Sequence, residues 1–502
     1  MNDTKLLTHL KSVHAAAEDG TTSYPRFIQD QLIKLHNVLS ESRDELLQAL
    51  QADAGLTTAE AHVELAETLQ LVKRFAVEEL DYEKWNKERK KALKEEGVSR
   101  SGKGVVVVVG EAAAPVYSVI GPFATAVAAG NAVVSLLAPE TKAVSSLLET
   151  KLSTKLDRFA YFFTRSASLS DILSVSSLPS PALIVGRNLP SIPDSLPRLL
   201  NTSGSSGSTV LIDRLSPAAH QNIAHLARLI VRGKLHALGR LPGSVARVLV
   251  HEESAGVVLD AVVQALKEAY GVDAALSGDY GRMRGEWDGE KKVRAEREKG
   301  EGKVVCGGAK GAKEEEGYFP PTIVEQPSLT FLRQDPAGPI LSFATFASHE
   351  DALVLLSKMD SQTLFLFSDD PHNLNYLAVE AGVPTVYTND IPVSALYEPA
   401  RNLTDISNYT LTTRIIRPPS ASSPTSKLFA PFTSPRLSAL TSLFPRERTL
   451  KFIRAKHSNS ILRVFFLQGL FISVGTILAC LLGTTGYGAY LGFGYLRRRF
   501  FL

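Results

Sequence analysis

The spacing of hydrophobic and polar residues changes along residues 105–137, and this change predicts a strand–helix–strand unit. Five consecutive valines, Val105–Val109, predict a strand that is buried on both faces. In the small, apolar segment that follows, we expect Pro122 in the first turn of a helix and Gly130 at the left-handed position that ends it. Ala132–Leu137 predicts the next strand. Such a unit is the building block of a parallel α/β sheet.

Other segments extend this pattern in both directions. Residues 26–80 have the apolar spacing of helices. The chain then contains, in order, KVVCGG…GYFPPTIV, GPI, EDA, LFLFSD and YTND, within residues 303–390. Together with the run GPFATAVAAGNAVV at 121–134, these segments resemble the aldehyde dehydrogenase superfamily, closest to its short, membrane-anchored fatty-aldehyde-type members. The resemblance covers residues 20–395.

The resemblance implies an α/β fold with two domains and a membrane segment. We expect N-terminal helices and a Rossmann-type nucleotide domain over residues 1–209, and an α/β catalytic-type domain over 210–395. An irregular linker is expected over 396–458. A C-terminal transmembrane helical segment is expected over 459–502.

The family's chemistry needs a cysteine thiolate, an amide that stabilises the oxyanion, a carboxylate base and NAD(P) as hydride acceptor. The family's K-F-x-N-x-G-Q-x-C run aligns with residues 234–242, so its cysteine falls on Pro242. Its oxyanion asparagine falls on Ala113, in the turn after the valine strand. Its glutamate base falls on Ser203, within SGSSGS. No catalytic residue is therefore expected at the matching positions, and Ser244 is a weak substitute for a nucleophile.

The two cysteines of the chain do not fill this gap. Cys306 lies at a predicted strand end, and Cys480 lies in the apolar tail. Both are interpreted as packing residues, and two cysteines are too few for a framework of disulfides.

Fewer of the residues that bind the cofactor in the family are present in this chain. The lysine that the family places after the GN pair is replaced by Leu136. Gly186 permits close backbone approach to a phosphate, Arg187 favours one electrostatically, and Asp335 keeps a carboxylate for a ribose. NAD(P) is thus the cofactor that the resemblance implies, and these three residues are its candidate contacts.

The tail predicts membrane attachment. Residues 464–496 contain no charged side chain, a length of roughly 50 Å if helical, against a hydrocarbon core of about 30 Å. A single tilted span and a hairpin broken near Gly483–Gly488 both remain open. By resemblance, the body faces the cytosol on the endoplasmic reticulum or a related membrane.

Charge and composition narrow the remaining functions. A net charge of +3 does not indicate nucleic-acid binding, and the eleven histidines show no metal-ligand spacing. The sequence therefore predicts a membrane-anchored pseudoenzyme with a binding or scaffold role. Its predicted partners are membrane lipid, a lipophilic aldehyde or lipid ligand, and a second copy or an active paralogue. The alternative is an active NAD(P)-dependent oxidoreductase that converts long-chain or isoprenoid aldehydes to acids.

Overall fold

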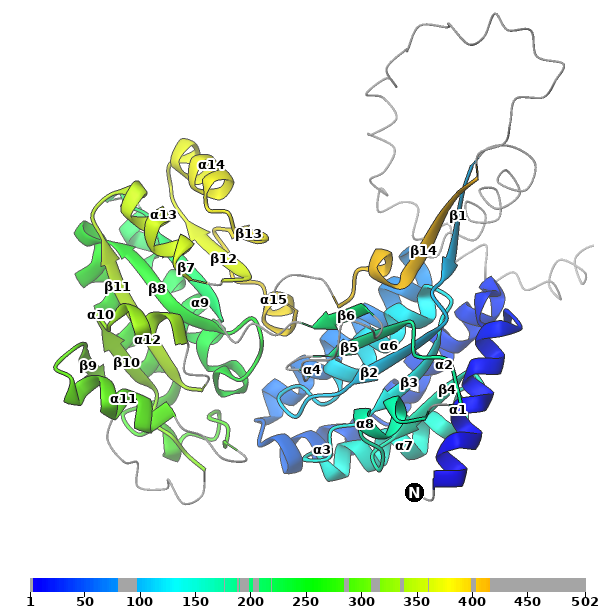
Figure 1. The fold of residues 1–502 in the computed structure, drawn as a ribbon. Coiled ribbons are helices and arrows are strands. Elements are labelled where there is room, and N and C mark those ends of the chain that lie inside the picture. The colour runs from blue at the N-terminus through cyan, green and yellow to red at the C-terminus, as the bar shows by residue number, and fades with distance from the viewer. Residues whose placement is uncertain are drawn as a thin grey trace, which may run out of the picture. The chain divides into compact units, whose positions relative to one another are not determined.

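Three sheets and their covering helices make up the described part of the chain (Figure 1). The coordinates are a computed structural model. They describe residues 3–79, 97–175, 177–186, 189, 198–201, 207–217, 219–283, 289–307, 317–334, 338–359, 361–398 and 403–415. Residues 1–417 form one compact unit. Within the described ranges, no helix is long and apolar enough to cross a membrane, and the predicted anchor, 459–502, lies outside them.

The N-terminal segment is helical, as its apolar spacing predicted. Its helices are α1 (Asp3–Glu18), α2 (Pro25–Glu41), α3 (Arg43–Ala54) and α4 (Thr58–Lys73), followed by a π-helical turn at Arg74–Glu79. Thr57 and Glu60 form a reciprocal capping box at the start of α4.

The nucleotide-type domain is built on a five-stranded parallel sheet with the order β4-β3-β2-β5-β6. The strands are β2 (Val105–Val109), β3 (Ala132–Leu136), β4 (Tyr161–Thr164), β5 (Leu183–Gly186) and β6 (Arg198–Asn201). The connecting helices are α6 (Tyr117–Ala128), α7 (Lys142–Lys155) and α8 (Leu169–Leu173). This confirms the predicted α/β unit.

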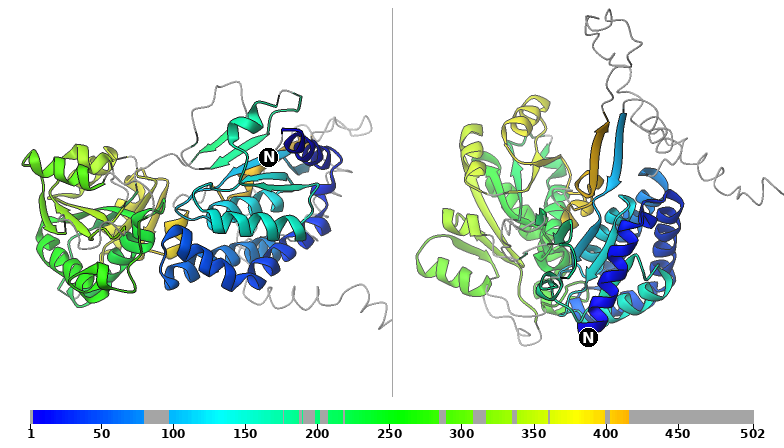
Figure 2. Two further views of the ribbon diagram at one scale, coloured as in Figure 1. Left: turned by 90° about the horizontal axis from the view of Figure 1, so that it is seen from below. Right: turned by 45° about the vertical axis from the view of Figure 1, so that its right-hand side comes forward.

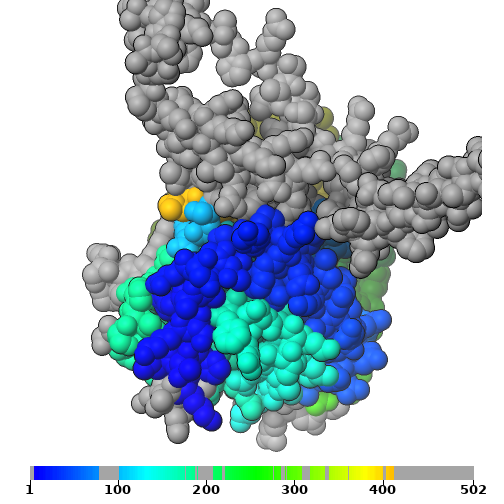
Figure 3. All heavy atoms as spheres, turned by 90° about the vertical axis from the view of Figure 1, so that its right-hand side faces the viewer, coloured from blue at the N-terminus to red at the C-terminus, as the bar shows by residue number. Residues whose placement is uncertain are grey.

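Alternating valines of β2 pack into two different cores, which explains why the strand is apolar throughout. Val106 and Val108 belong to the main core, which also contains residues of α2, α4 and α6. Val105 and Val107 pack on the other face against Leu10 and other residues of α1. Figure 3 views the molecule from the side on which the blue N-terminal residues border the cyan surface of this domain.

The prediction for Pro122 is wrong, whereas that for Gly130 is confirmed. Helix α6 begins at Tyr117, so Pro122 lies inside it. Gly130 has φ = 84° and directly follows the last residues of the helix. The helix starts earlier than its local sequence indicates because a carboxylate from α4 caps it, as described below.

The catalytic-type domain contains a seven-stranded sheet with the order β13-β12-β7-β8-β11-β10-β9. Its strands are β7 (Ser208–Ile212), β8 (Val245–His251), β9 (Lys303–Cys306), β10 (Thr322–Glu325), β11 (Ile340–Phe346), β12 (Thr363–Phe367) and β13 (Thr385–Thr388). All neighbours are parallel except β9 and β10. The helices are α9 (Ile223–Leu235), α10 (Glu252–Tyr270), α11 (Gly289–Glu298), α12 (Leu329–Gln334), α13 (His349–Ser357), α14 (Pro371–Glu380) and α15 (Val393–Tyr397).

A separate antiparallel ladder pairs β1 (Gly97–Gly102) with β14 (Thr410–Ile415), and Figure 1 and the right-hand view of Figure 2 show these strands side by side. Asn131 supports the base of this ladder, because its Nδ2 donates to Tyr409 O at 3.1 Å. The ladder therefore joins the segment that precedes β2 to the last described residues.

Candidate functional site

The turn before β8 holds Pro242, the position predicted for the nucleophile. Helix α9 ends at Leu235, and three consecutive residues then take left-handed conformations: Ala237 (φ 51°), Leu238 (φ 54°) and Gly239 (φ 69°). A non-glycine residue in this region costs on the order of 1–3 kcal/mol, and such strain concentrates at functional sites. The backbone shape of a specialised site is thus present.

Two glycines show how tightly this turn is packed. A Cβ on Gly239 would lie 2.4 Å from Gly338 O, and Gly338 N donates to Gly239 O at 3.2 Å. A Cβ on Gly243 would lie 1.9 Å from Ala395 O, and Gly243 N donates to Leu396 O at 2.9 Å. Pro242 therefore lies between two glycines that each contact the backbone of another segment. It carries neither a nucleophilic atom nor an N–H.

Neither substitute nucleophile in the described chain is suitably placed. Ser244 is 3% exposed, and its hydroxyl has no hydrogen-bond partner among the described residues, so no base activates it. Cys306 ends β9 and is three strands from β8 in the sheet, which corresponds to about 14 Å at the usual strand spacing. Cys480 lies outside the described residues.

The turn after β2 holds Ala113, the position predicted for the oxyanion amide. Ser118 fixes this turn, because its hydroxyl accepts from Glu111 N at 2.9 Å and donates to Glu111 O at 3.3 Å. The methyl group of Ala113 supplies no hydrogen-bond donor. Gly186 ends β5 in the adjacent strand. Ser203, Arg187 and Asp335 lie outside the described residues.

Sequence reasoning missed a buried carboxylate, Glu64 of α4, which is 1% exposed. Its Oε1 accepts from Val116 N at 2.9 Å and from Tyr117 N at 3.1 Å, so it caps the N-terminus of α6. Its Oε2 has no hydrogen-bond partner among the described residues. Burial raises the pKa of Glu64 from 4.5 to about 7, although the two backbone N–H groups and Arg240 act in the opposite direction.

Arg240 connects this region to the N-terminal helices. Its Nη2 donates to Ala54 O at 2.6 Å, at the last residue of α3, and its Nε donates to Ala237 O at 3.1 Å. Burial lowers the pKa of Arg240, whereas attraction to Glu60 and Glu64 raises it. Glu60 Oε1 in turn accepts from Ala237 N at 2.8 Å. We call Glu60, Glu64 and Arg240 the carboxylate–arginine cluster.

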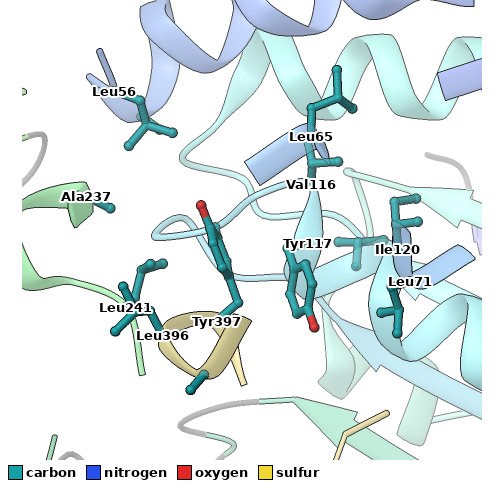
Figure 4. Packing of buried hydrophobic residues seen from close by; sticks show 14 of the residues in the cluster. Leu56, Leu65, Leu71, Val116, Tyr117, Ile120, Ala237, Leu241, Leu396 and Tyr397 are labelled. Carbon is teal, nitrogen blue, oxygen red and sulfur yellow. The ribbon is translucent and has the colours of Figure 1, made fainter. Parts of the chain in front are cut away.

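Two tyrosines occupy the interior next to this cluster (Figure 4). The rings of Tyr117 and Tyr397 are 5.1 Å apart, and the residues are 8% and 4% exposed. Tyr397 Oη lies 2.9 Å from His236 Nε2, and Tyr117 Oη donates to Glu398 Oε2 at 3.4 Å. Burial raises the pKa of both phenols well above 10 and lowers that of His236. Figure 4 also shows Leu241 and Leu396 beside Tyr397, so apolar side chains and paired polar groups fill this space.

One sequence signal could have identified Glu64. It shares the inward face of α4 with Ala61, Leu65 and Thr68, at spacings of three and four residues. A carboxylate on an apolar stripe needs a partner. No comparable signal marks Tyr117 or Tyr397, because buried tyrosines are common in any core.

Comparison with known proteins gives a consistent result. The model of the aldehyde dehydrogenase family matches residues 10–155 and 215–400. The 4,4'-diaponeurosporen-aldehyde dehydrogenase of Staphylococcus aureus is 24% identical over 367 residues, which cover 68% of this chain and 76% of that protein. The dimeric NADP-preferring aldehyde dehydrogenase of Rattus norvegicus is 22% identical, covering 76% and 85%. The substrate-bound structure of Staphylococcus aureus AldH superposes with a TM-score of 0.67 at 19% identity, covering 84% and 97%.

Proposed function

The chain belongs to the aldehyde dehydrogenase family, and we propose that it is a catalytically impaired, membrane-anchored member that acts by binding or as a scaffold. The observation that carries this proposal is Pro242, clamped in the turn before β8 where the family alignment places its cysteine. Without a thiolate, no covalent adduct with an aldehyde forms at this position.

The surroundings of Pro242 support the same conclusion. Ala113 supplies no donor for an oxyanion, and loss of one such donor costs on the order of a hundredfold in rate. Tyr117 and Tyr397 fill the adjoining interior with paired polar groups. The described side chains at the cofactor end of the nucleotide-type sheet do not fit a dinucleotide, so the proposal contains no hydride-transfer step.

The carboxylate–arginine cluster gives the impaired centre a structural role. Arg240 and Glu60 connect the turn before β8 to α3 and α4 through charge-assisted hydrogen bonds, each with one backbone group of the other segment. These contacts hold the catalytic-type domain against the N-terminal helices without any ligand. A stable body of this kind suits a protein that presents a surface to a partner.

Membrane attachment and partners are further parts of the proposal. The uncharged stretch at 464–496 supports an anchor in the endoplasmic reticulum or a related membrane, with the body in the cytosol. We propose a second copy or an active paralogue as the partner, and the relative from Rattus norvegicus is named as dimeric. Fractionation of cells that express the full chain or residues 1–458 tests the anchor: the full chain stays in membranes after alkaline extraction, and the shorter one does not.

Turnover decides between the proposal and its alternative, an active NAD(P)-dependent oxidoreductase on long-chain or isoprenoid aldehydes. The full chain in detergent is mixed with a long-chain aldehyde and NAD⁺ or NADP⁺, and formation of the reduced cofactor is followed next to an active aldehyde dehydrogenase. We expect no reduction above the rate without protein. Reduction that a thiol alkylator stops, and that Cys306→Ser also abolishes, would establish the alternative and reject the proposal.

A further inference from the structure

The nucleotide-type sheet has one end at which its topology favours a ligand. In open parallel sheets, ligands bind outside the carboxyl ends of the strands, where the strand order reverses. The chain runs from β2 to β3 and β4 on one side, and β5 and β6 follow on the other side of β2. The reversal therefore lies between β2 and β5 (Figure 1), whose last residues are Val109 and Gly186.

Leu189 occupies this point. A Cβ built on Gly186 would lie 3.0 Å from Leu189 Cδ2, 3.0 Å from Val109 Cβ and 3.3 Å from Val109 O. Leu189 is 7% exposed and packs in the same core as Val105 and Val107. The space that Gly186 leaves open is thus filled by a leucine of this chain.

The helix N-terminus at this end of the sheet is also occupied. A phosphate at such a site is bound by free N–H groups in the first turn of the helix after the first strand. At the start of α6, Val116 N and Tyr117 N both donate to Glu64 Oε1. A phosphate would have to displace a buried carboxylate that already has these two bonds.

The three residues that directly follow β3 carry no carboxylate for a ribose hydroxyl. Leu136, Leu137 and Ala138 are 3–4% exposed. Thr141 Oγ1 and Ser145 Oγ both donate to Ala138 O, at 3.3 and 2.8 Å, and keep this turn close to the sheet. The first carboxylate after the strand, Glu140, is exposed to solvent.

We infer that Leu189 closes the dinucleotide crevice between β2 and β5, so that this domain is a packed structural module and not a site for NAD(P). The inference rests on the proposed function and extends it to the cofactor side of the molecule. It replaces the prediction that Gly186 contacts the cofactor with a packing role for that glycine.

Fluorescence titration of the full chain with NADH and NADPH tests the inference, using Leu189→Ala and the matched control Leu173→Ala. Leu173 is a partly buried leucine of the same core that does not lie over Gly186. Both variants remove the same atoms from one apolar cluster, so a general loosening of this core affects both. Thermal unfolding of each variant checks that it is folded.

We expect no saturable binding by the wild-type chain or by Leu173→Ala up to the highest nucleotide concentration used, and saturable binding by Leu189→Ala with a Kd at least tenfold below that concentration. Saturable binding by the wild-type chain overturns the inference. Equal absence of binding in all three folded proteins also overturns it, because Leu189 is then not the group that closes the crevice. Neither result changes the test of the proposed function, which measures turnover and not binding.

Discussion

Glu64→Gln should remove a large part of the pH dependence of folding stability. The pKa of Glu64 rises from 4.5 to about 7 in the folded chain because the carboxyl group is buried. Below pH 4.5 the group is protonated in both states, and its contribution to stability is fully present. Between 4.5 and about 7 only the unfolded chain ionises, so the free energy of unfolding falls as the pH rises. Above about 7 the loss is complete.

The expected magnitude follows from these two values. The difference between 4.5 and about 7 corresponds to about 3 kcal/mol, at about 1.4 kcal/mol for each pKa unit. Glutamine keeps an oxygen for Val116 N and Tyr117 N but does not titrate. The free energy of unfolding of the wild-type chain should therefore fall by about 3 kcal/mol relative to Glu64→Gln, from about pH 4 to about pH 8.

Urea unfolding of the full chain in detergent, at several pH values, measures this difference. Subtracting the two curves removes the titration of all other groups. Glu41→Gln, at the exposed end of α2, is the matched control for the loss of one carboxylate. If the difference between wild type and Glu64→Gln does not change with pH, the assignment of a buried, neutral carboxyl group to Glu64 is refuted.

Three further outcomes follow from the turn before β8. Gly243→Ala should lower the free energy of unfolding by on the order of 1–3 kcal/mol, because the new methyl group would contact Ala395 O. In Gly256→Ala, a change in α10, the methyl group meets nothing within 4 Å, and the free energy of unfolding should rise by up to about 1 kcal/mol. Urea unfolding measures both changes. Arg240→Leu should destabilise the chain by on the order of 1–3 kcal/mol in the same assay, because Ala54 O and Ala237 O then lose a charged hydrogen-bond donor. Pro242→Cys combined with Ala113→Asn should give no measurable oxidation of a long-chain aldehyde with NAD⁺, because the adjoining interior stays filled; turnover above background would contradict the packing shown in Figure 4.

Sequence patterns predicted those features of the fold that depend only on neighbouring residues. The valines of β2 and the left-handed Gly130 are confirmed, because burial on both faces and positive φ each restrict the residue type directly. The start of α6 was misplaced because its cap comes from Glu64, 52 residues earlier in the chain. The local sequence of α6 does not contain the distant residue that caps the helix.

The sequence predicted which catalytic residues the candidate site lacks, but not which residues fill the space next to them. Pro242 and Ala113 follow from alignment alone, since an absent thiol or amide is visible in the sequence. Tyr117 and Tyr397 are 280 positions apart, and only the folded chain brings their rings to 5.1 Å. The assignments of Ser203, Arg187 and Asp335 remain predictions.

The pairing of β1 with β14 has a consequence for synthesis on the ribosome. Ser101 pairs with Leu411, so β1 has no partner until 310 further residues have been added. At ordinary translation rates of about 5–20 residues per second, this delay lasts roughly 15–60 seconds. During that time the nascent chain carries an open strand edge, which is a template for aggregation. Residues 97–102 therefore complete their backbone hydrogen bonding only after the last described part of the chain has been synthesised.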